Sequence, residues 1–335
     1  MRFSLIDGLR DDEFCVFFSK SYQELFARIY NSDFKCLKID NSKQITYLPL
    51  IIRKLKDHNY EAFSSYGYGG LIGEKIKLSN KEIKSLKNFL SKKNIHSLFI
   101  RHSPFLENHN FWPDELIEAN RITYETSLTF SSDYISFKKT LKQKIRSSIN
   151  HTEKSNFSVN YVKNPIESSL KDFYELYLTR MNEIRVEKFY YFDYKLFKGH
   201  FEKFSERCRL ITIHNSKAQI VAGAVFLCDP KLKIVHYHLS ASSREGLRHQ
   251  CNELLISYAI FIFGNEGYQR IHLGGGIKLD ESDGLSRFKS KFSNNKKVFY
   301  ITKLICNPDL YFQTRSSFKI KNKEYFLIGD ALEKK

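Results

Sequence analysis

The chain contains one structural pattern twice. Residues 36–51 read CLKIDNSKQITYLPLI, and residues 210–226 read LITIHNSKAQIVAGAVF. In both segments apolar residues alternate with a period of two on each side of an Asn-Ser-Lys tripeptide, which predicts a β-hairpin. Asn tolerates a positive φ, which suits the turn of such a hairpin.

The segments that follow the two hairpins also match. The first hairpin precedes a predicted helix at 81–93 and a strand at 95–101, and the second precedes a helix at 252–263 and a strand at 268–273. One shared tripeptide can arise by chance, but the same order of elements at similar spacing indicates an internal duplication. We therefore predict two tandem domains of mixed α/β class with mixed central sheets. A site between two such domains is the default expectation.

A basic segment separates the two halves. A strand is predicted at 122–130 and a helix at 134–150, where Phe137, Leu141, Ile145 and Ile149 form the apolar stripe. The helix carries five cations, Lys138, Lys139, Lys142, Lys144 and Arg146. Two interpretations remain open, a solvated face or a surface that contacts phosphates or tRNA. The formal net charge of +17 leaves the same choice, because it favours polyanionic partners but also suits a merely Lys-rich surface.

Membrane and metal classes are disfavoured. The most apolar run, at 254–263, is about half of the ~20 residues that a spanning helix needs. None of the six cysteines forms a C-x-x-C pair, so a zinc ribbon is unsupported. We expect a cytoplasmic protein without a metal site or a permanently bound cofactor, and leave open its association with the inner face of the membrane.

Three glycines follow the predicted strand at 268–273. Gly274, Gly275 and Gly276 allow a backbone to approach a ligand closely. Their spacing matches neither the dinucleotide-binding fingerprint nor a P-loop, so a tight turn is an equally good interpretation.

A short helix with a lysine beside its apolar stripe is predicted after the glycines. The segment 283–292 reads DGLSRFKSKF, with Asp283 or Ser282 as its N-cap. Three apolar residues recur at helical spacing and are expected to face inward, namely Leu285, Phe288 and Phe292. Lys289 would lie next to that stripe, either stabilising a developing oxyanion or extending along the surface.

Histidines and tyrosines supply further candidates. His236 and His238 lie on one face of the predicted strand 234–239, on either side of Tyr237. They lack a third metal ligand at suitable spacing, which leaves a polar pocket wall, with His238 deprotonating an amine, or a structural pair. The cluster FYYFDY, which includes Tyr191, stacks on a sugar ring or belongs to the core.

Residues 272–311 resemble the Fem-type peptidyltransferases and related GNAT-like N-acyltransferases. The resemblance is carried by a strand that ends in Gly-Gly, an acidic loop and the run Asp-x-Leu-x-x-Phe-Lys-x-x-Phe, which here begins at Asp283. Weaker similarity covers 97–104, 141–159, 188–192 and 234–242. It implies tandem GNAT-like domains, the first at 1–130 and the second at 131–305, with a tail at 306–335 that packs back on them.

The resemblance also implies roles for individual residues. Lys289 and His238 are expected to be catalytic. The expected substrate-binding residues are Tyr191, His236, Tyr237, Arg101, Lys188, Phe288 and Asp283. The expected residues for the co-substrate are Gly274, Gly275, Gly276 and Arg248, although SSREGLRHQC (242–251) matches the usual pyrophosphate loop of GNAT enzymes poorly.

The implied activity is transfer of an acyl group, with acyl-CoA as the leading donor, to the amine of a nucleotide- or lipid-linked amino sugar in surface-glycan biosynthesis. One alternative is an aminoacyl-tRNA-dependent peptidyltransferase that acts on a peptidoglycan precursor, and another is a basic RNA-binding protein without catalysis. The chain departs from the family because it lacks the helical coiled-coil arm and carries His236 and His238 where relatives can have tyrosines. No stable protein partner is expected.

Overall fold

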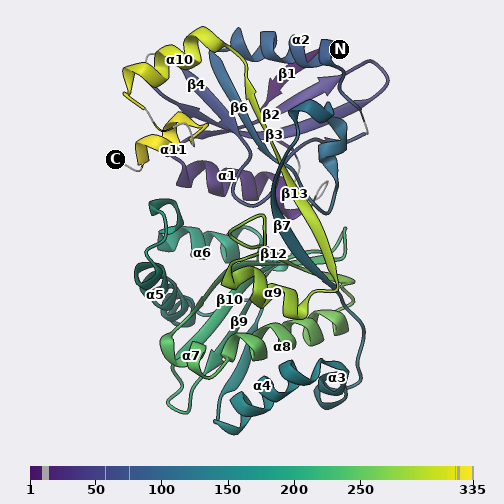
Figure 1. Cartoon of the computed structure of the whole chain (residues 1–335), viewed down its shortest axis with the longest axis vertical. Coiled ribbons are helices and arrows are strands. Elements are labelled where there is room, and N and C mark those ends of the chain that lie inside the picture. Colours follow the sequence, from purple (N-terminus) through teal and green to yellow (C-terminus); the bar gives the residue numbers. More distant parts are fainter. Residues whose placement is uncertain (10–14, 57, 75, 321, 323–324, 334–335) are drawn as a thin grey trace. The chain divides into compact units, whose positions relative to one another are not determined.

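The chain divides into two compact units. The computed structural model describes residues 1–9, 15–56, 58–74, 76–320, 322 and 325–333. Unit 1 is formed by Met1–Arg121 and Val298–Lys335, and unit 2 by Ile122–Lys297 (Figure 1). The boundaries predicted from the sequence lie after residues 130 and 305, a few residues further along. The described residues after 305 all belong to unit 1.

Unit 1 is built on a mixed sheet. Its strands, in spatial order, are β1 (Arg2–Ile6), β2 (Asp33–Asp40), β3 (Ile45–Lys54), β4 (Tyr60–Phe63), β6 (Ile95–Arg101) and β13 (Asn295–Ile305), and β5 (Ile72–Gly73) pairs with β3. β4 and β6 run parallel, and the other neighbours run antiparallel. Its helices are η1 (Val16–Phe18), α1 (Lys20–Ile29), α2 (Asn80–Ser91), η2 (Asn108–Phe111), η3 (Asp114–Leu116), α10 (Pro308–Ser317) and α11 (Ile328–Glu333).

Unit 2 repeats the arrangement. Its strands, in spatial order, are β8 (Ser158–Val162), β9 (Cys208–His214), β10 (Ile220–Asp229), β11 (Ile234–Ser242), β12 (Arg270–Gly275) and β7 (Glu118–Ser127). Its helices are α3 (Tyr134–Thr140), α4 (Gln143–Lys154), α5 (Glu167–Ile184), η4 (Lys188–Tyr190), α6 (Tyr194–Lys203), η5 (Ser205–Arg207), α7 (Arg244–Arg248), α8 (Cys251–Asn265) and α9 (Gly284–Phe292).

The two sheets have the same order of strand directions. In each, three antiparallel pairings are followed by one parallel pairing, β4 with β6 or β11 with β12, and then by one more antiparallel pairing. The strand added in this last pairing comes from outside the repeat: β6 pairs with β13, although β7 follows it in the chain, and β12 pairs with β7. The two Asn-Ser-Lys hairpins, β2–β3 and β9–β10, occupy equivalent positions. The predicted duplication and the mixed α/β class are confirmed.

The hairpin turns use asparagine differently from the prediction. The Oδ1 atom of Asn41 accepts hydrogen bonds from the backbone N–H of Lys43 and Gln44, and that of Asn215 accepts from Lys217 and Gln219. The positive φ falls on Ser42 (73°) and Ala218 (59°) instead. Each Asn therefore shapes its turn through its side chain.

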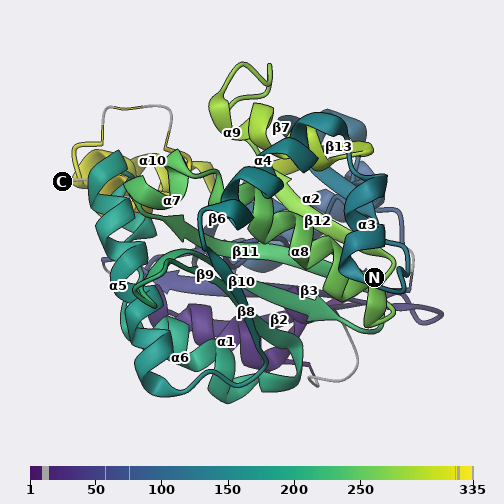
Figure 2. The ribbon, with the colours of Figure 1, turned by 90° about the horizontal axis from the view of Figure 1, so that it is seen from below.

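Helices cover both faces of the sheet of unit 2. Residues of α8, including Leu255, Ala259 and Phe263, pack with Ala222, Ala224 and Phe226 of β10 in one core. Gly223 points to the other face, where a Cβ atom would lie 2.7 Å from the ring of Phe173 in α5. Strand alternation thus separates an α8 face from an α5–α6 face (Figures 1 and 2). Within the described part of the chain, no helix is both long and apolar enough to cross a membrane.

The basic segment forms two helices, so the single helix predicted at 134–150 is wrong. α3 ends at Thr140 and α4 begins at Gln143, with extended backbone at Leu141 and Lys142. Apolar residues every fourth position drift about 40° per step around a helix of 100° per residue. In a continuous helix the side chains of Phe137 and Ile149 would point about 120° apart. The break lets both side chains join the core that includes residues of α8.

Candidate functional site

The parallel strands β11 and β12 separate partway along their length. Their ladder consists of three pairs and ends with His236 opposite His272. Beyond this pair β11 continues to Ser242 and β12 to Gly275. The ends of the two strands therefore border an opening in the sheet, which we call the β11–β12 gap.

A β-bulge lies in each strand just beyond that last pair. In β11, Tyr237 pairs with Phe226 and Leu239 pairs with Val225, so His238 is the extra residue. In β12 the register shifts between His272 and Gly274. Bulges bend a strand and redirect a side chain, and they are frequent beside active sites.

The equivalent strands of unit 1 remain bridged. After β4, the backbone N–H of Ser64 donates to the carbonyl of Phe99 at 3.0 Å, and that of Gly69 donates to the carbonyl of Arg101 at 2.7 Å. The guanidinium of Arg101 lies over the ring of Phe99 and reaches the carbonyl of Ser64 at 3.4 Å. Arg101 thus belongs to this closed arrangement in unit 1, whereas the other predicted site residues lie in unit 2.

Four histidines adjoin the β11–β12 gap. The rings of His236 and His272 meet at a centroid distance of 5.6 Å, and the Nε2 atoms of His238 and His200 lie 3.1 Å apart. His236 is only 1% exposed, and His238 is half-buried. Burial lowers the pKa of His200 to about 4, and burial together with nearby cations, Lys289 first, lowers that of His272 to about 3. The rings are therefore neutral near pH 7.

Lys289 is a buried lysine at the end of β12. Its side chain is 7% exposed, and its Nζ donates to the carbonyl of Gly275 at 2.8 Å. The same Nζ lies 6.0 Å from the centroid of the Tyr237 ring. Gly274 has a φ of 75°, and a Cβ atom there would lie 3.2 Å from Nζ. Glycine at this position thus accommodates both the backbone conformation and the ammonium group.

Asp283 holds the loop between β12 and α9. It caps α9, as predicted, because Oδ1 accepts from the backbone N–H of Ser286 at 2.9 Å. Its Oδ2 accepts from Ile277 and Lys278 at 3.1 and 3.2 Å. Burial raises the pKa of this carboxyl, but the hydrogen bonds, those from Ser286 foremost, outweigh burial and hold it below the ordinary value. The contacts of Asp283 within the loop support the position of Lys289.

The apolar stripe of α9 is only partly as predicted. Phe292 is buried, and Phe288 packs against the core with its ring centroid 5.5 Å from that of Phe292. Leu285 is 40% exposed, so the prediction that it faces inward is wrong. It lies in the first turn of α9, where Ser286 occupies the buried position instead.

The remaining predicted residues lie around α5 and α7. The hydroxyl of Tyr191 donates to the carbonyl of Met181 near the end of α5. Lys188 is exposed in η4, and Arg248 is exposed at the end of α7. Arg244 pairs with Glu183 at 2.8 Å and so joins α7 to the end of α5. These contacts bring Lys188, Tyr191 and Arg248 onto adjoining elements.

Sequence patterns missed two histidines of the site. His200 lies in α6, and no motif marks it. His272 precedes the three glycines, but nothing in a single sequence shows that it will face His236. Both placements depend on the packing of separate elements.

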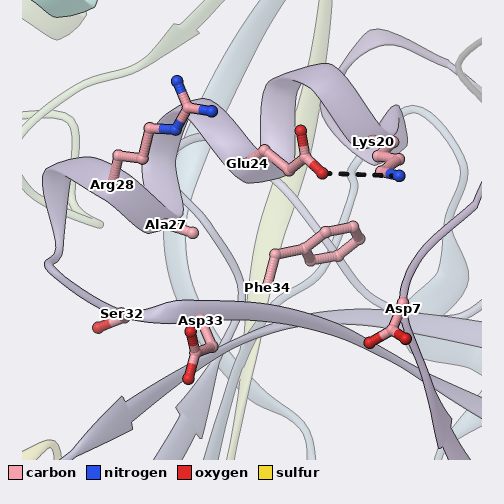
Figure 3. Close-up of a pocket in the computed structure, with 8 residues that line it drawn as sticks. All are labelled: Asp7, Lys20, Glu24, Ala27, Arg28, Ser32, Asp33 and Phe34. Carbon is pink, nitrogen blue, oxygen red and sulfur yellow. Dashed lines mark ion pairs between the residues drawn. The ribbon is translucent and has the colours of Figure 1, made fainter.

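A surface hollow elsewhere contains none of the predicted residues. It has a volume of about 380 Å³, lies in unit 1 and is bordered by α1, Asp7 and Asp33 (Figure 3). Its charged side chains include the pair Lys20–Glu24 at 3.7 Å. It is an open, solvated surface rather than a site with buried polar groups.

All six cysteines are buried. Burial raises the pKa of four of them to about 12, namely Cys36, Cys228, Cys251 and Cys306. A thiol reacts as its thiolate, so these groups are inert near neutral pH. Among the described residues, no group of three or more His, Cys, Asp or Glu side chains is arranged to hold a metal ion.

Comparison with known proteins identifies the fold. No protein-family model and no curated protein sequence matches the chain. The chain is similar to the crystal structure of FemX, with a TM-score of 0.61 and 13% identity over 87% of this chain and 92% of that one. It is also similar to L-PGS from Bacillus licheniformis, with a TM-score of 0.54 and 13% identity over 92% and 98% of the two chains.

A third solved structure has the same duplicated architecture. It is a tandem GNAT protein from the clavulanic acid biosynthesis pathway, with a TM-score of 0.51 and 8% identity over 92% of this chain and 99% of that one. The chain therefore has the Fem-like, tandem GNAT fold that the motifs around Asp283 predict. At these identities the similarity establishes the fold alone.

Proposed function

We propose that the protein is an N-acyltransferase whose reaction takes place at the β11–β12 gap of unit 2. The observation that carries the proposal is that both strands change just beyond their last pair, where β11 bulges at His238 and the end of β12 holds the buried ammonium group of Lys289. The equivalent strands of unit 1 are bridged by backbone hydrogen bonds, which leaves unit 2 as the place for a reacting carbonyl.

The charges suit attack by an amine on an activated carbonyl. The nitrogen of the acceptor forms a bond to the carbonyl carbon, and the π electrons move to the oxygen. A fixed ammonium group stabilises such an oxyanion without reorganisation, which is the role we assign to Lys289. His238, neutral because burial lowers its pKa, accepts the proton that the amine loses.

The tetrahedral intermediate then collapses. The bond from carbon to the leaving sulfur or oxygen breaks, and the leaving group is protonated to a thiol or hydroxyl. No covalent enzyme intermediate is required, which agrees with the burial of all six cysteines. Binding supplies the proximity and orientation of the two substrates.

We assign acyl-CoA as the donor and an amino sugar on a nucleotide or lipid carrier as the acceptor. Tyr191, His236, Tyr237 and Phe288 are assigned to the acceptor, and Gly274–Gly276, Lys188 and Arg248 to the phosphate-bearing parts of the substrates. Exposed cations on η4 and α7 suit phosphates, and aromatic rings suit a sugar face.

A second candidate is aminoacyl transfer from tRNA. It is favoured by the exposed cations Lys139, Lys142 and Lys144 on and next to α3 and α4. The Nζ of Lys142 donates to the carbonyl of Lys291 at 3.2 Å, so this basic surface adjoins α9, which carries Lys289. Such a surface suits a polyanionic donor.

The test is a mass-spectrometric screen of the purified protein. One arm supplies acetyl-CoA with nucleotide-linked amino sugars, and the other supplies aminoacyl-tRNA with amine acceptors. An N-acylated product in the first arm supports the leading assignment, and one in the second arm supports the alternative. Salt-sensitive RNA binding with no product in either arm would overturn catalysis and leave an RNA-binding protein.

A further inference from the structure

We propose that His200 is a positioning residue that fixes the tautomer of His238, so that Nδ1 of His238 is the atom that accepts the proton of the acceptor amine. The role in catalysis rests on the proposed function. The tautomers themselves follow from hydrogen bonds within unit 2 and are measurable without any substrate.

The first contact defines the tautomer of His200. This residue lies in α6, its side chain is fully buried, and its Nδ1 is 2.7 Å from the backbone carbonyl of Leu196. A carbonyl oxygen only accepts hydrogen bonds, so Nδ1 of His200 carries a hydrogen. Because the ring is neutral near pH 7, its Nε2 then carries the lone pair.

The second contact transfers this constraint to His238. The two Nε2 atoms lie 3.1 Å apart, which is a hydrogen-bond distance between nitrogens. Since Nε2 of His200 accepts, Nε2 of His238 must donate. His238 is therefore the Nε2–H tautomer, and its lone pair lies on Nδ1.

The backbone supports the same orientation of the ring. His238 is the extra residue of the bulge in β11, and its side chain is half-buried beside the β11–β12 gap. The hydrogen bond to a buried partner on α6 holds Nε2 in place, so in the neutral ring the lone pair on Nδ1 is the basic nitrogen. Partners that orient a functional histidine in this way are a recurrent feature of protein sites.

The proton transfer balances without any further reactant. As the bond from nitrogen to the carbonyl carbon forms, the amine proton moves to the lone pair on Nδ1, and His238 becomes an imidazolium that still donates from Nε2 to His200. The imidazolium then returns the proton to the departing sulfur or oxygen. The products are an amide and a thiol or alcohol, and both histidines regain their starting tautomers.

The first arm of the test is ¹⁵N NMR of protein with labelled histidine near pH 7, without substrate. We expect His200 as the Nδ1–H tautomer, His238 as the Nε2–H tautomer, and a nitrogen–nitrogen coupling across the hydrogen bond between them. A hydrogen on Nδ1 of His238, or on Nε2 of His200, would overturn the proposal. This arm decides the tautomers even if no acyl transfer is found, so its failure is distinct from failure of the proposed function.

The second arm compares His200→Phe with His200→Gln. Phenylalanine keeps an aromatic ring but cannot accept a hydrogen bond, whereas the amide oxygen of glutamine can accept from Nε2 of His238. We expect kcat to fall roughly tenfold to 100-fold in His200→Phe with KM little changed, and to recover substantially in His200→Gln. Equal losses in two variants of equal melting temperature would show that His200 serves packing only.

Discussion

His236 and His272 are the last paired residues of β11 and β12, and their rings meet with centroids 5.6 Å apart and planes inclined at 69°. Both side chains are buried, and burial lowers the pKa of each. The base of the β11–β12 gap is thus lined by neutral rings, while the ammonium group of Lys289 lies at its β12 edge. The two rings therefore add no positive charge at the base of the gap near pH 7.

Burial of neutral histidines predicts a loss of stability in acid. Relative to the ordinary value of 6.5, the folded pKa falls to about 4 for His96 and His200 and to about 3 for His102 and His272. Below pH 6.5 the unfolded chain binds more protons than the folded one. The contribution of these histidines to the free energy of unfolding is therefore fully present above pH 6.5 and is lost as the pH falls toward 4. Each histidine lowers the free energy of unfolding by up to about 1.4 kcal/mol for each pH unit in this range.

The measurement is the urea midpoint of unfolding between pH 8 and pH 5. His102→Gln keeps a group able to bond with Thr302, which His102 contacts at 2.8 Å, but does not titrate. We expect a shallower loss of stability in this variant than in the wild type. A wild-type midpoint that stays constant or rises from pH 7 to pH 5 would contradict the prediction.

Gly276 is expected to be needed for the loop that carries Asp283. A Cβ atom at Gly276 would lie 1.8 Å from Oγ of Ser286 and 2.8 Å from Oδ2 of Asp283, so Gly276→Ala must disturb the cap of α9. The loss of a helix cap costs about 1 kcal/mol, and displacement of α9 would also lower turnover. Gly284→Ala is the control, since the nearest atom to its Cβ is 3.9 Å away. Similar melting temperatures and turnover in both variants would refute this.

A buried ion pair is expected to fasten the C-terminal helix of unit 1. Glu61 is fully buried, and its Oε1 forms an ion pair with Arg53 at 2.6 Å. Oε1 also accepts a hydrogen bond from the backbone N–H of Gly329 at 3.0 Å, and Oε2 accepts one from the backbone N–H of Ile328 at 2.7 Å. Removing one partner of a buried pair leaves an uncompensated charge, so Arg53→Met should destabilise the protein by about 3–5 kcal/mol.

The matched control for this pair is Lys303→Met. Lys303 pairs with Glu118 at the surface at 2.8 Å, and such a pair is worth about 0–1 kcal/mol. Chemical denaturation of both variants measures the difference. A loss for Arg53→Met no larger than that for Lys303→Met would show that the buried pair does not fasten the helix.

The repeat could be predicted from sequence because its signals are local. The predicted strand at 95–101 coincides with β6, and the cap at Asp283 begins α9. These elements depend on period-two alternation and on capping chemistry within a few residues. The resemblance of the segment around Phe288 and Lys289 to the Fem-type family predicted the tandem GNAT fold, which the comparisons confirm.

The rest depended on contacts between distant residues. The break between α3 and α4 carries neither Pro nor Gly, and arises because Phe137 and Ile149 must both reach one core. The bulge at His238 is set by pairing with Val225 and Phe226, and the bond to His200 is set by packing of α6. A single sequence records none of these tertiary constraints.

Lys289 is predicted to act in the transition state. Its ammonium group is held by the carbonyl of Gly275 at 2.8 Å and by the burial of its stem between α9 and the end of β12. A preorganised donor of this kind is worth about 10²–10³ in turnover. Lys289→Met keeps the stem and removes the charge, so kcat should fall by that factor while KM changes little, the pattern of an interaction made in the transition state.

Lys291 supplies the matched control for this variant. It lies two residues further along α9, its side chain is 50% exposed, and it pairs with Glu253 at 2.9 Å. Lys291→Met removes the same charge from the same helix but leaves the β11–β12 gap intact, so turnover should stay near the wild-type value. Lys289→Met also leaves the carbonyl of Gly275 without this donor, at a cost of about 1–3 kcal/mol, so kinetics are compared well below both melting temperatures. Equal and modest losses of turnover in the two variants would show that Lys289 contributes only general positive charge, and the catalytic assignment would fail.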